Sequence, residues 1–430
     1  MQTNPQLGLV RGIRRWDLVA ITINGIIGAG IFGLPAKVYS LIGSYSLFAF
    51  IACGLVVALI ILCFAEVGSR FDETGGPYLY SRIAFGSTVA FEIGWLIWLA
   101  RLTAFAANCN LMVNYLSYFW PSASSSFWRP LIITLFVATL TTINILGIRE
   151  ATLVSNVFTI GKLIPILIFI CAGLFFINPT SYTLGAAPST GAFSQSVLLL
   201  IYAFTGFEMA VIPAGEVDNP QKHLPRALLI ALTLVALLYF SIQVVCVGTL
   251  PELSQSTKPL ADAASRFLGT AGGAIISAGA IISITGNLNI LVLSGSRVPF
   301  AMAEQKQLPS LLSLVHPRFS TPYVAILISS TVMLILTLKS SFVAALTVSA
   351  IARLVTYAAT CVALPLLRRK AGTPQAQFRL PGGIFIACLS LVLIVWLVAN
   401  STIQEAKVAA IAAVVGFLIF LSYKLYSRSS

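Results

Sequence analysis

Long apolar segments alternate with short polar segments along almost the whole chain. Each apolar segment approaches the length of about 20 residues that a membrane-spanning helix requires. The pattern predicts twelve helices, near residues 17–41, 44–68, 85–118, 129–147, 154–178, 195–217, 225–250, 270–303, 323–337, 342–367, 383–400 and 406–425. The predicted fold class is therefore an all-α membrane protein with 12 transmembrane helices.

The composition agrees with a membrane protein and excludes three other classes. Of the 430 residues, 58% are hydrophobic and only 9% are charged, whereas about a quarter of the residues in a soluble domain are charged. Such a chain has too little polar surface to cover a water-soluble particle of its size. A soluble enzyme, a disordered protein and a nucleic-acid binder are therefore excluded, and the lipid bilayer is the expected environment.

The basic residues predict the orientation of the chain in the membrane. The formal net charge is +13, and Lys and Arg collect on the cytoplasmic side of short loops. An even number of spans places both termini on one side. If that side is cytoplasmic, it holds seventeen of the 26 Lys and Arg residues, with about six outside and three within the membrane. Both termini are therefore expected in the cytoplasm, and the protein in the cell (inner) membrane.

The polar segments at the two ends are too short to form a soluble domain. We expect a cytoplasmic tail over residues 1–16, one transmembrane domain over residues 17–425 and a second tail over residues 426–430. The N-terminus lacks the short apolar core and cleavage site of a removable signal peptide. The seven cysteines and two histidines form no CxxC or Cys/His cluster, so no disulfide framework, metal site or other cofactor is indicated.

Two of the predicted helices contain residues that interrupt a helix. The first carries four closely spaced glycines followed by a proline, in INGIIGAGIFGLP. The sixth carries YAFTGFEMAVIP, with Gly206, Glu208 and Pro213 inside an otherwise apolar span. We expect both helices to be unwound, within about residues 27–33 and 203–209.

The positions of these two breaks predict an internal repeat. They lie five helices apart, in segments that would cross the membrane in opposite directions. This is the layout of a 5+5 inverted repeat, with repeat one near residues 17–178, repeat two near 195–367, and two further helices within 383–425. Irregular backbone at this depth is tolerated only where it lines a cavity or is buried in protein. The alternative is that the glycines serve close helix packing, because Ala29 and Gly33 form a small-xxx-small pair.

Six segments of the sequence resemble one family of membrane proteins, the amino acid–polyamine–organocation (APC) permeases. The segments are GIIGAGIFGLP, FAEVGSRFDETGGPYLY, GWLIWLARLTAFAAN, FTGFEMAVIPAGEVDNPQKHLPRA, SGSRVPFAMAEQKQLP and VHPRFSTPY, in that order between residue 17 and about residue 325. The resemblance implies a LeuT-type fold of five plus five inverted helices, with helices 1 and 6 unwound and two further helices at the C-terminal end. It also implies uptake or exchange of amino acids or related amines.

The first break offers backbone N–H groups to a substrate. An unwound helix leaves N–H groups without intrahelical partners at the positive end of a helix dipole. In the first predicted helix these donors belong to Gly28, Ala29 and Gly30, and glycine lets an anion approach the backbone closely. The α-carboxylate of an amino acid is the expected ligand, and the family resemblance implies the same role.

The second break offers backbone carbonyl groups. Those near Ala203, Phe204 and Thr205 suit the α-ammonium group of a substrate, a role that the resemblance also implies. Phe207 and Tyr202 are candidates for an apolar wall or a gate, with packing in the protein core as the alternative.

Lys162 is the single charge in the fifth predicted helix, about eight residues inside the membrane. That depth is roughly 12 Å, too far for the side chain to reach the interface easily. Burial favours the neutral form of an ammonium group, so Lys162 is a candidate proton carrier. In some APC permeases, a lysine on this helix occupies the place of a sodium ion, and the resemblance implies that role for Lys162. The alternative is a permanently charged strut that bonds helix carbonyls.

Three further polar residues lie deep within predicted helices. Arg101 falls on the inward face of its helix, and Glu208 at the second break is its expected partner, with direct substrate contact as the alternative. Asn287 is expected to face Lys162. Arg353 is equally deep, but the sequence does not decide which way it faces.

Together these residues predict a secondary active transporter of amino acids. Nothing resembles a hydrolase triad, a phosphate loop or a redox centre, so the protein is expected not to be an enzyme. A proton is the expected coupling ion, and transport would proceed by alternating access. An obligate amino-acid exchanger is the first alternative, and a non-transporting sensor is disfavoured by the short tails. Because midplane cations outnumber anions, neutral substrates are expected first, acidic ones second and cationic ones last.

Overall fold

The computed structural model describes residues 13–73, 75–147, 151–212, 214 and 217–429. Over these residues the regular structure is helical, apart from one isolated bridge between Ile13 and Val217. Each of the twelve apolar segments contains a helix. The helices outside the two predicted interruptions are α3 (Ser46–Gly68), α5 (Ser87–Leu116), α6 (Trp128–Leu146), α7 (Ala151–Gly173), α10 (Pro220–Thr249), α11 (Pro259–Glu304), α12 (Tyr323–Lys339), α13 (Phe342–Arg369), α14 (Gly383–Ala399) and α15 (Ile403–Ser429).

The lengths of these helices agree with a multi-pass membrane protein. In the described part of the chain, seven helical segments are long and apolar enough to cross a membrane, and four shorter apolar helices accompany them. Many of their large apolar side chains point outwards: Phe175 is 88% exposed, Phe385 70% and Val395 66%. A soluble protein rarely exposes so much contiguous apolar surface. The prediction of an all-helical fold is confirmed for the described residues, and the apolar helices are consistent with a membrane protein. The number of twelve spans and the inverted repeat stay predictions.

Two helical stretches were not predicted, because neither is long and apolar. Helix α4 (Gly76–Phe85) begins after Gly75, which has φ +148°, and ends before Gly86, which has φ +91°. Helix α11 starts at Pro259, and non-helical dihedral angles at Gly269 separate its first turns from the long apolar part. Glycine is the residue that adopts positive φ readily.

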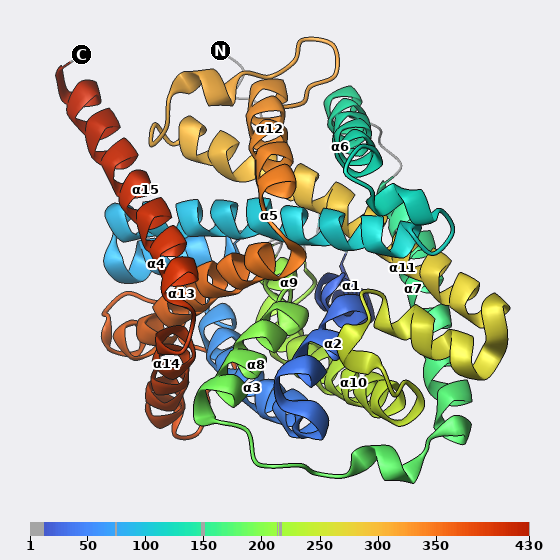
Figure 1. The fold of residues 1–430 in the computed structure, drawn as a ribbon. Coiled ribbons are helices and arrows are strands. Elements are labelled where there is room, and N and C mark those ends of the chain that lie inside the picture. The colour runs from blue at the N-terminus through green and yellow to red at the C-terminus, as the bar shows by residue number, and fades with distance from the viewer. Residues whose placement is uncertain (1–12, 74, 148–150, 213, 215–216, 430) are drawn as a thin grey trace.

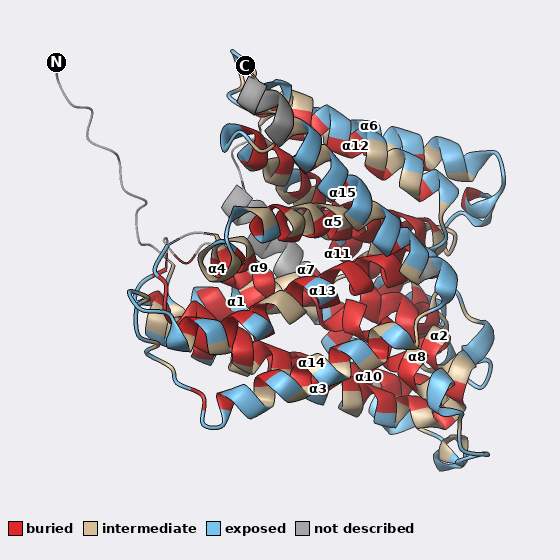
Figure 2. Cartoon of the chain, turned by 90° about the vertical axis from the view of Figure 1, so that its left-hand side faces the viewer, coloured by how far each residue is buried: buried red, intermediate tan, exposed pale blue. Residues whose placement is uncertain are grey.

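The long helix α5 divides the molecule, as Figure 1 shows. Helices α6 and α12 lie on one side of it, and α1 (Arg15–Ile26), α2 (Gly30–Ile42), α3, α8 (Thr190–Phe204) and α10 lie on the other. Figure 2 shows buried residues concentrated in this second group and in α13, whereas α6 and α15 are largely exposed. The interrupted helices are therefore at the centre of the protein.

Both predicted interruptions are present. Helix α1 ends at Ile26 and α2 begins at Gly30, so residues 27–29 are not helical. Helix α8 ends at Phe204 and the short helix α9 (Glu208–Val211) follows it, so residues 205–207 are not helical either. Each interruption is three residues long and lies inside the predicted range.

The second interruption is in direct backbone contact with the last turn of α1. A Cβ atom added to Gly206 would lie 2.1 Å from the carbonyl oxygen of Gly25, and one added to Gly25 would lie 2.6 Å from that of Gly206. Gly206 also has φ +109°, a conformation that other residues adopt only with strain. Glycine is therefore required at both positions for the broken helices to touch.

The variant Gly206→Ala tests this contact. We expect it to lower stability by at least about 1–3 kcal/mol from backbone strain alone, with a further loss from the clash with Gly25. The measurement is the thermal unfolding midpoint of the purified protein in detergent.

Gly54→Ala in α3 is the matched control. The nearest atom to its added Cβ would be the Cβ of Ala236, at an ordinary 3.8 Å. Because alanine favours a helix interior over glycine, this variant should be as stable as the parent protein or more so. Equal midpoints for both variants would contradict the close backbone contact.

Candidate substrate site

A small cavity lies between the two interruptions. Its volume is about 30 Å³, which is room for one or two water molecules. Six of the predicted site residues line it: Gly28, Ala29, Gly30, Tyr202, Thr205 and Asn287. Asn108 and Arg353 are further polar residues in its lining. An amino acid can enter only when some of these side chains move apart.

The N–H groups at the first interruption are partly free. The Gly28 N–H donates to the Ile26 carbonyl at 2.8 Å, so it is used within the chain. In the described structure, no group accepts a hydrogen bond from the N–H of Ala29 or Gly30. These two donors stand at the N-terminal, positive end of α2 and are available to an anion.

At the second interruption, too, one backbone group is already hydrogen-bonded within the chain and others are free. The Ala203 carbonyl accepts a hydrogen bond from the Tyr239 hydroxyl at 3.2 Å. For the carbonyls of Phe204 and Thr205, the described residues provide no donor. The side chains of Ala203 and Phe204 do not line the cavity.

Phe207 lies outside the cavity. Its ring is fully buried and packs against Phe64, with centroids 5.1 Å apart, and against Tyr357, at 5.0 Å. This position matches the alternative of core packing that the sequence left open.

A chain of side-chain hydrogen bonds crosses the cavity. The Tyr202 hydroxyl donates to Asn108 Oδ1, and Asn108 Nδ2 donates to Asn287 Oδ1 at 2.7 Å. Asn287 therefore bonds to α5 and lies next to Gly28. That it faces Lys162 stays a prediction. The chain connects α8, α5 and α11 around the cavity.

Lys162 contacts the end of α1. Its Nζ donates to the carbonyls of Asn24 and Ile27, both at 2.8 Å, and the residue is only 3% exposed. The neighbouring carbonyl of Ile26 accepts from the Tyr239 hydroxyl at 3.0 Å. A lysine and a tyrosine thus cap the C-terminal, negative end of α1 immediately before the interruption. A proton carrier and a structural strut both require these contacts.

The expected pair of Arg101 and Glu208 is wrong. Glu208 forms an ion pair with Arg353, accepts from the Tyr357 hydroxyl at 2.8 Å and accepts from the Gly206 N–H at 2.9 Å. Arg101 instead donates to the Ser294 carbonyl on α11 at 2.6 Å. Spacing along α5 predicts an inward face, but it does not fix which neighbouring helix that face meets.

Two buried arginines and one carboxylate therefore lie together next to the substrate cavity. Arg101, Arg353 and Glu208 line a second cavity of about 20 Å³, and Arg353 lines the substrate cavity as well. Counting one charge for each group, this cluster carries one net positive charge.

Sequence reasoning missed three residues that shape the site. Asn108 and Tyr357 are polar groups within apolar helices, a signal that marks them as candidates but names no partner. The sequence gives no signal for Tyr239, because a tyrosine in an apolar helix can equally well pack in the core without a role in the site.

The comparisons with known proteins give one answer over nearly the whole chain. The family described as amino acid permease matches residues 13–420. The serine/threonine exchanger SteT of Bacillus subtilis (strain 168) is 31% identical, with 95% of this chain and 95% of that protein covered.

Two further proteins of the same organism are similar at lower identity. The methylthioribose transporter is 28% identical, with 98% of this chain and 94% of that protein covered. The branched-chain amino acid permease BcaP is 26% identical, with 99% and 95% covered. The family resemblance is thus confirmed, and the chain belongs to the amino acid permease family of the APC superfamily.

Proposed function

We propose that this permease is a proton-coupled secondary transporter that carries amino acids across the cell (inner) membrane by alternating access. The observation that carries the proposal is the pair of hydrogen bonds from Lys162 Nζ to the carbonyls of Asn24 and Ile27. These bonds lie next to the first interruption, where the N–H groups of Ala29 and Gly30 have no partner among the described residues. The proposed architecture has twelve spans, a 5+5 inverted repeat within one transmembrane domain over residues 17–425, and both termini in the cytoplasm.

Substrate binding is proposed to use the two interruptions together. The free N–H groups of Ala29 and Gly30, with the glycine backbone at Gly28, suit an α-carboxylate. The free carbonyls of Phe204 and Thr205 suit an α-ammonium group. Because Gly206 of the second interruption touches Gly25 in the last turn of α1, both charged ends of one amino acid can be bound at once.

Coupling is proposed to act through the position of α1. A protonated Lys162 makes charge-assisted hydrogen bonds to two carbonyls at the end of this helix, and such bonds are about twice as strong as neutral ones. Loss of the proton weakens both bonds and shifts the equilibrium between two positions of α1. Proton release and substrate release are thereby linked.

Variants of Lys162 test the coupling. Lys162→Ala should abolish accumulation of amino acids driven by an acid-outside gradient in proteoliposomes, while exchange between the two sides persists. Lys162→Arg separates a proton carrier from a strut, because arginine keeps its charge at all relevant pH values. A carrier loses accumulation in this variant, whereas a strut retains it.

Lys407→Ala is the control for these variants, since Lys407 is exposed on α15 and lies outside the substrate cavity. It should accumulate amino acids as the parent protein does. Accumulation that persists in Lys162→Ala, or that requires sodium in the parent protein, would remove Lys162 from the coupling step.

An obligate exchanger is the second candidate, because one of the similar proteins is a serine/threonine exchanger. Uptake into empty proteoliposomes distinguishes the two functions. A proton-coupled transporter accumulates a labelled amino acid in empty vesicles when the outside is acidic. An exchanger takes up label only when the vesicles are preloaded with an amino acid, whatever the pH gradient.

The charge cluster of Arg101, Arg353 and Glu208 predicts the order of substrates. Because it carries one net positive charge, neutral amino acids should compete best and acidic ones second. A cationic side chain in this low-dielectric site loses at least about 2–3 kcal/mol, which is an affinity roughly 30- to 150-fold lower. Competition against uptake of a neutral amino acid measures this order, and strong inhibition by arginine or putrescine would contradict it.

A further inference from the structure

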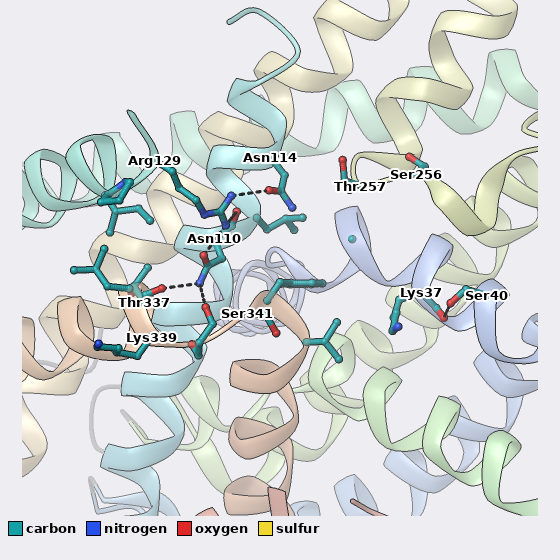
Figure 3. A pocket seen from close by; sticks show the side chains of 18 of the residues that line it. Lys37, Ser40, Asn110, Asn114, Arg129, Ser256, Thr257, Thr337, Lys339 and Ser341 are labelled. Atoms are coloured by element: carbon teal, nitrogen blue, oxygen red, sulfur yellow. Dashed lines mark hydrogen bonds between the residues drawn. The ribbon is translucent and has the colours of Figure 1, made fainter. Parts of the chain in front are cut away.

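A large polar cavity lies at the end of the molecule where α2, α5 and α12 end and α13 begins. We call it the vestibule; its volume is about 550 Å³, within the range of small-molecule sites. Figure 3 shows its polar side chains, which come from these helices, from α6 and from the segment before α11. Under the proposed topology this end faces the outside of the cell.

The vestibule lies directly beyond the substrate cavity. Gly33, Leu111 and Phe342 line it, and a Cβ added to Gly33 would be 2.8 Å from the Phe342 ring and 3.0 Å from Leu111. Gly33 and Leu111 follow Gly30 and Asn108, which line the substrate cavity, by three residues each. Three residues of helix span about 4.5 Å, so a single layer of side chains separates the two cavities.

The charged groups of the vestibule are all positive. Lys37, Arg129 and Lys339 line it, and no Asp or Glu is among its lining residues. Lys37 and Arg129 are half-buried. Among the ion pairs of the described residues, none involves any of these three cations. Their charges are therefore not neutralised within the described part of the protein.

The guanidinium group of Arg129 is held in place by uncharged partners. Its Nη1 donates to Asn114 Oδ1 at 3.2 Å, and its Nη2 donates to Asn110 Oδ1 at 2.6 Å (Figure 3). Asn110 is fixed in turn, because its Nδ2 donates to the carbonyls of Thr337 and Ser340, both at 3.2 Å. Amide oxygens orient the guanidinium as carboxylates would, but they leave its positive charge available to a ligand.

We infer that the vestibule is a binding site for a carboxylate group, and that the α-carboxylate of an amino acid docks there before the substrate moves on to the inner cavity. A cleft that is lined by charges of one sign and has low-dielectric walls concentrates ions of the opposite sign. The hydroxyl of Thr257 supplies a neighbouring hydrogen-bond donor. Those of Ser40 and Ser256 already donate to the Lys37 carbonyl at 2.7 Å and to Asp262 Oδ2 at 2.6 Å. The inference rests on the proposed function for the identity of the ligand, and an inorganic anion shares the same chemistry.

The variant Asn114→Asp tests the site with almost no change of shape. The aspartate keeps the hydrogen bond to Arg129 and cancels one positive charge. We expect the KM for a transported neutral amino acid to rise about threefold to tenfold, the size of one partly exposed ion pair, because the aspartate repels a carboxylate bound beside Arg129. The maximal rate should be unchanged. Raising the salt concentration should increase the KM of the parent protein and have little effect on this variant.

Thr183→Asp is the matched control for charge. Thr183 is exposed and does not line the vestibule. The neighbouring Ser181 accepts a hydrogen bond from Ser44, just after α2, at 3.2 Å, so its loop lies at the same end of the molecule. The KM of this control should match that of the parent protein. An equal rise of KM in both variants would mean that any added negative charge on this surface has the same effect, and would overturn the inference.

A second experiment does not depend on transport. In a background with Cys171→Ser and Cys388→Ser, which removes the exposed thiols, a reporter is introduced as Ser254→Cys in the vestibule or as Thr183→Cys outside it. The rates of modification by a negatively charged and a positively charged methanethiosulfonate are then compared. The ratio of negative to positive reagent should be at least about fivefold higher at the vestibule reporter, and Asn114→Asp should lower it.

The outcomes separate this inference from the proposed function. Equal ratios at the two reporters would overturn the vestibule site even if the protein transports amino acids. A raised ratio without any transport would retain an anion site and contradict the transporter. Protection of the Ser254→Cys reporter by a neutral amino acid supports docking of the substrate. If chloride protects the reporter equally and the amino acid adds nothing, the vestibule is an inorganic-anion site and substrate docking is overturned.

Discussion

The backbone contact between Gly25 and Gly206 is the constraint on which the centre of this protein depends. Two helices can meet so closely only where neither has a side chain. The interruptions beside this contact leave backbone groups without helical partners inside the protein, where each such group is costly unless it is satisfied. Side chains from α7 and α10 satisfy the end of α1, whereas the groups that remain free face the substrate cavity.

The helices were predictable because their signal is local. Apolar length alone located all twelve helical segments, and glycines with a proline located both interruptions to within a few residues. Helix α4 was not predicted, because its ten residues of mixed polarity carry no such signal. Helix length does not fix the number of membrane spans, because four of the apolar helices in the described residues are shorter than the seven that are long enough to cross.

The site was predictable only where the backbone itself provides the groups. The two interruptions line the cavity, and with them the predicted residues Gly28, Ala29, Gly30 and Thr205. Pairing between distant side chains was not predictable, since it depends on the rotation of each helix about its axis. Arg101 was assigned to Glu208 on helical spacing, yet Arg353 occupies that place from another helix.

Tyr239 has a mechanical consequence. Its hydroxyl reaches the Ile26 carbonyl on α1 and the Ala203 carbonyl on α8, at 3.0 and 3.2 Å, from a third helix. A hydroxyl has a single proton, so the two acceptors share it, and separating α1 from α8 would strand one of them in a dry interior. The shared proton therefore opposes separation of α1 from α8 and favours movement of both helices together with α10.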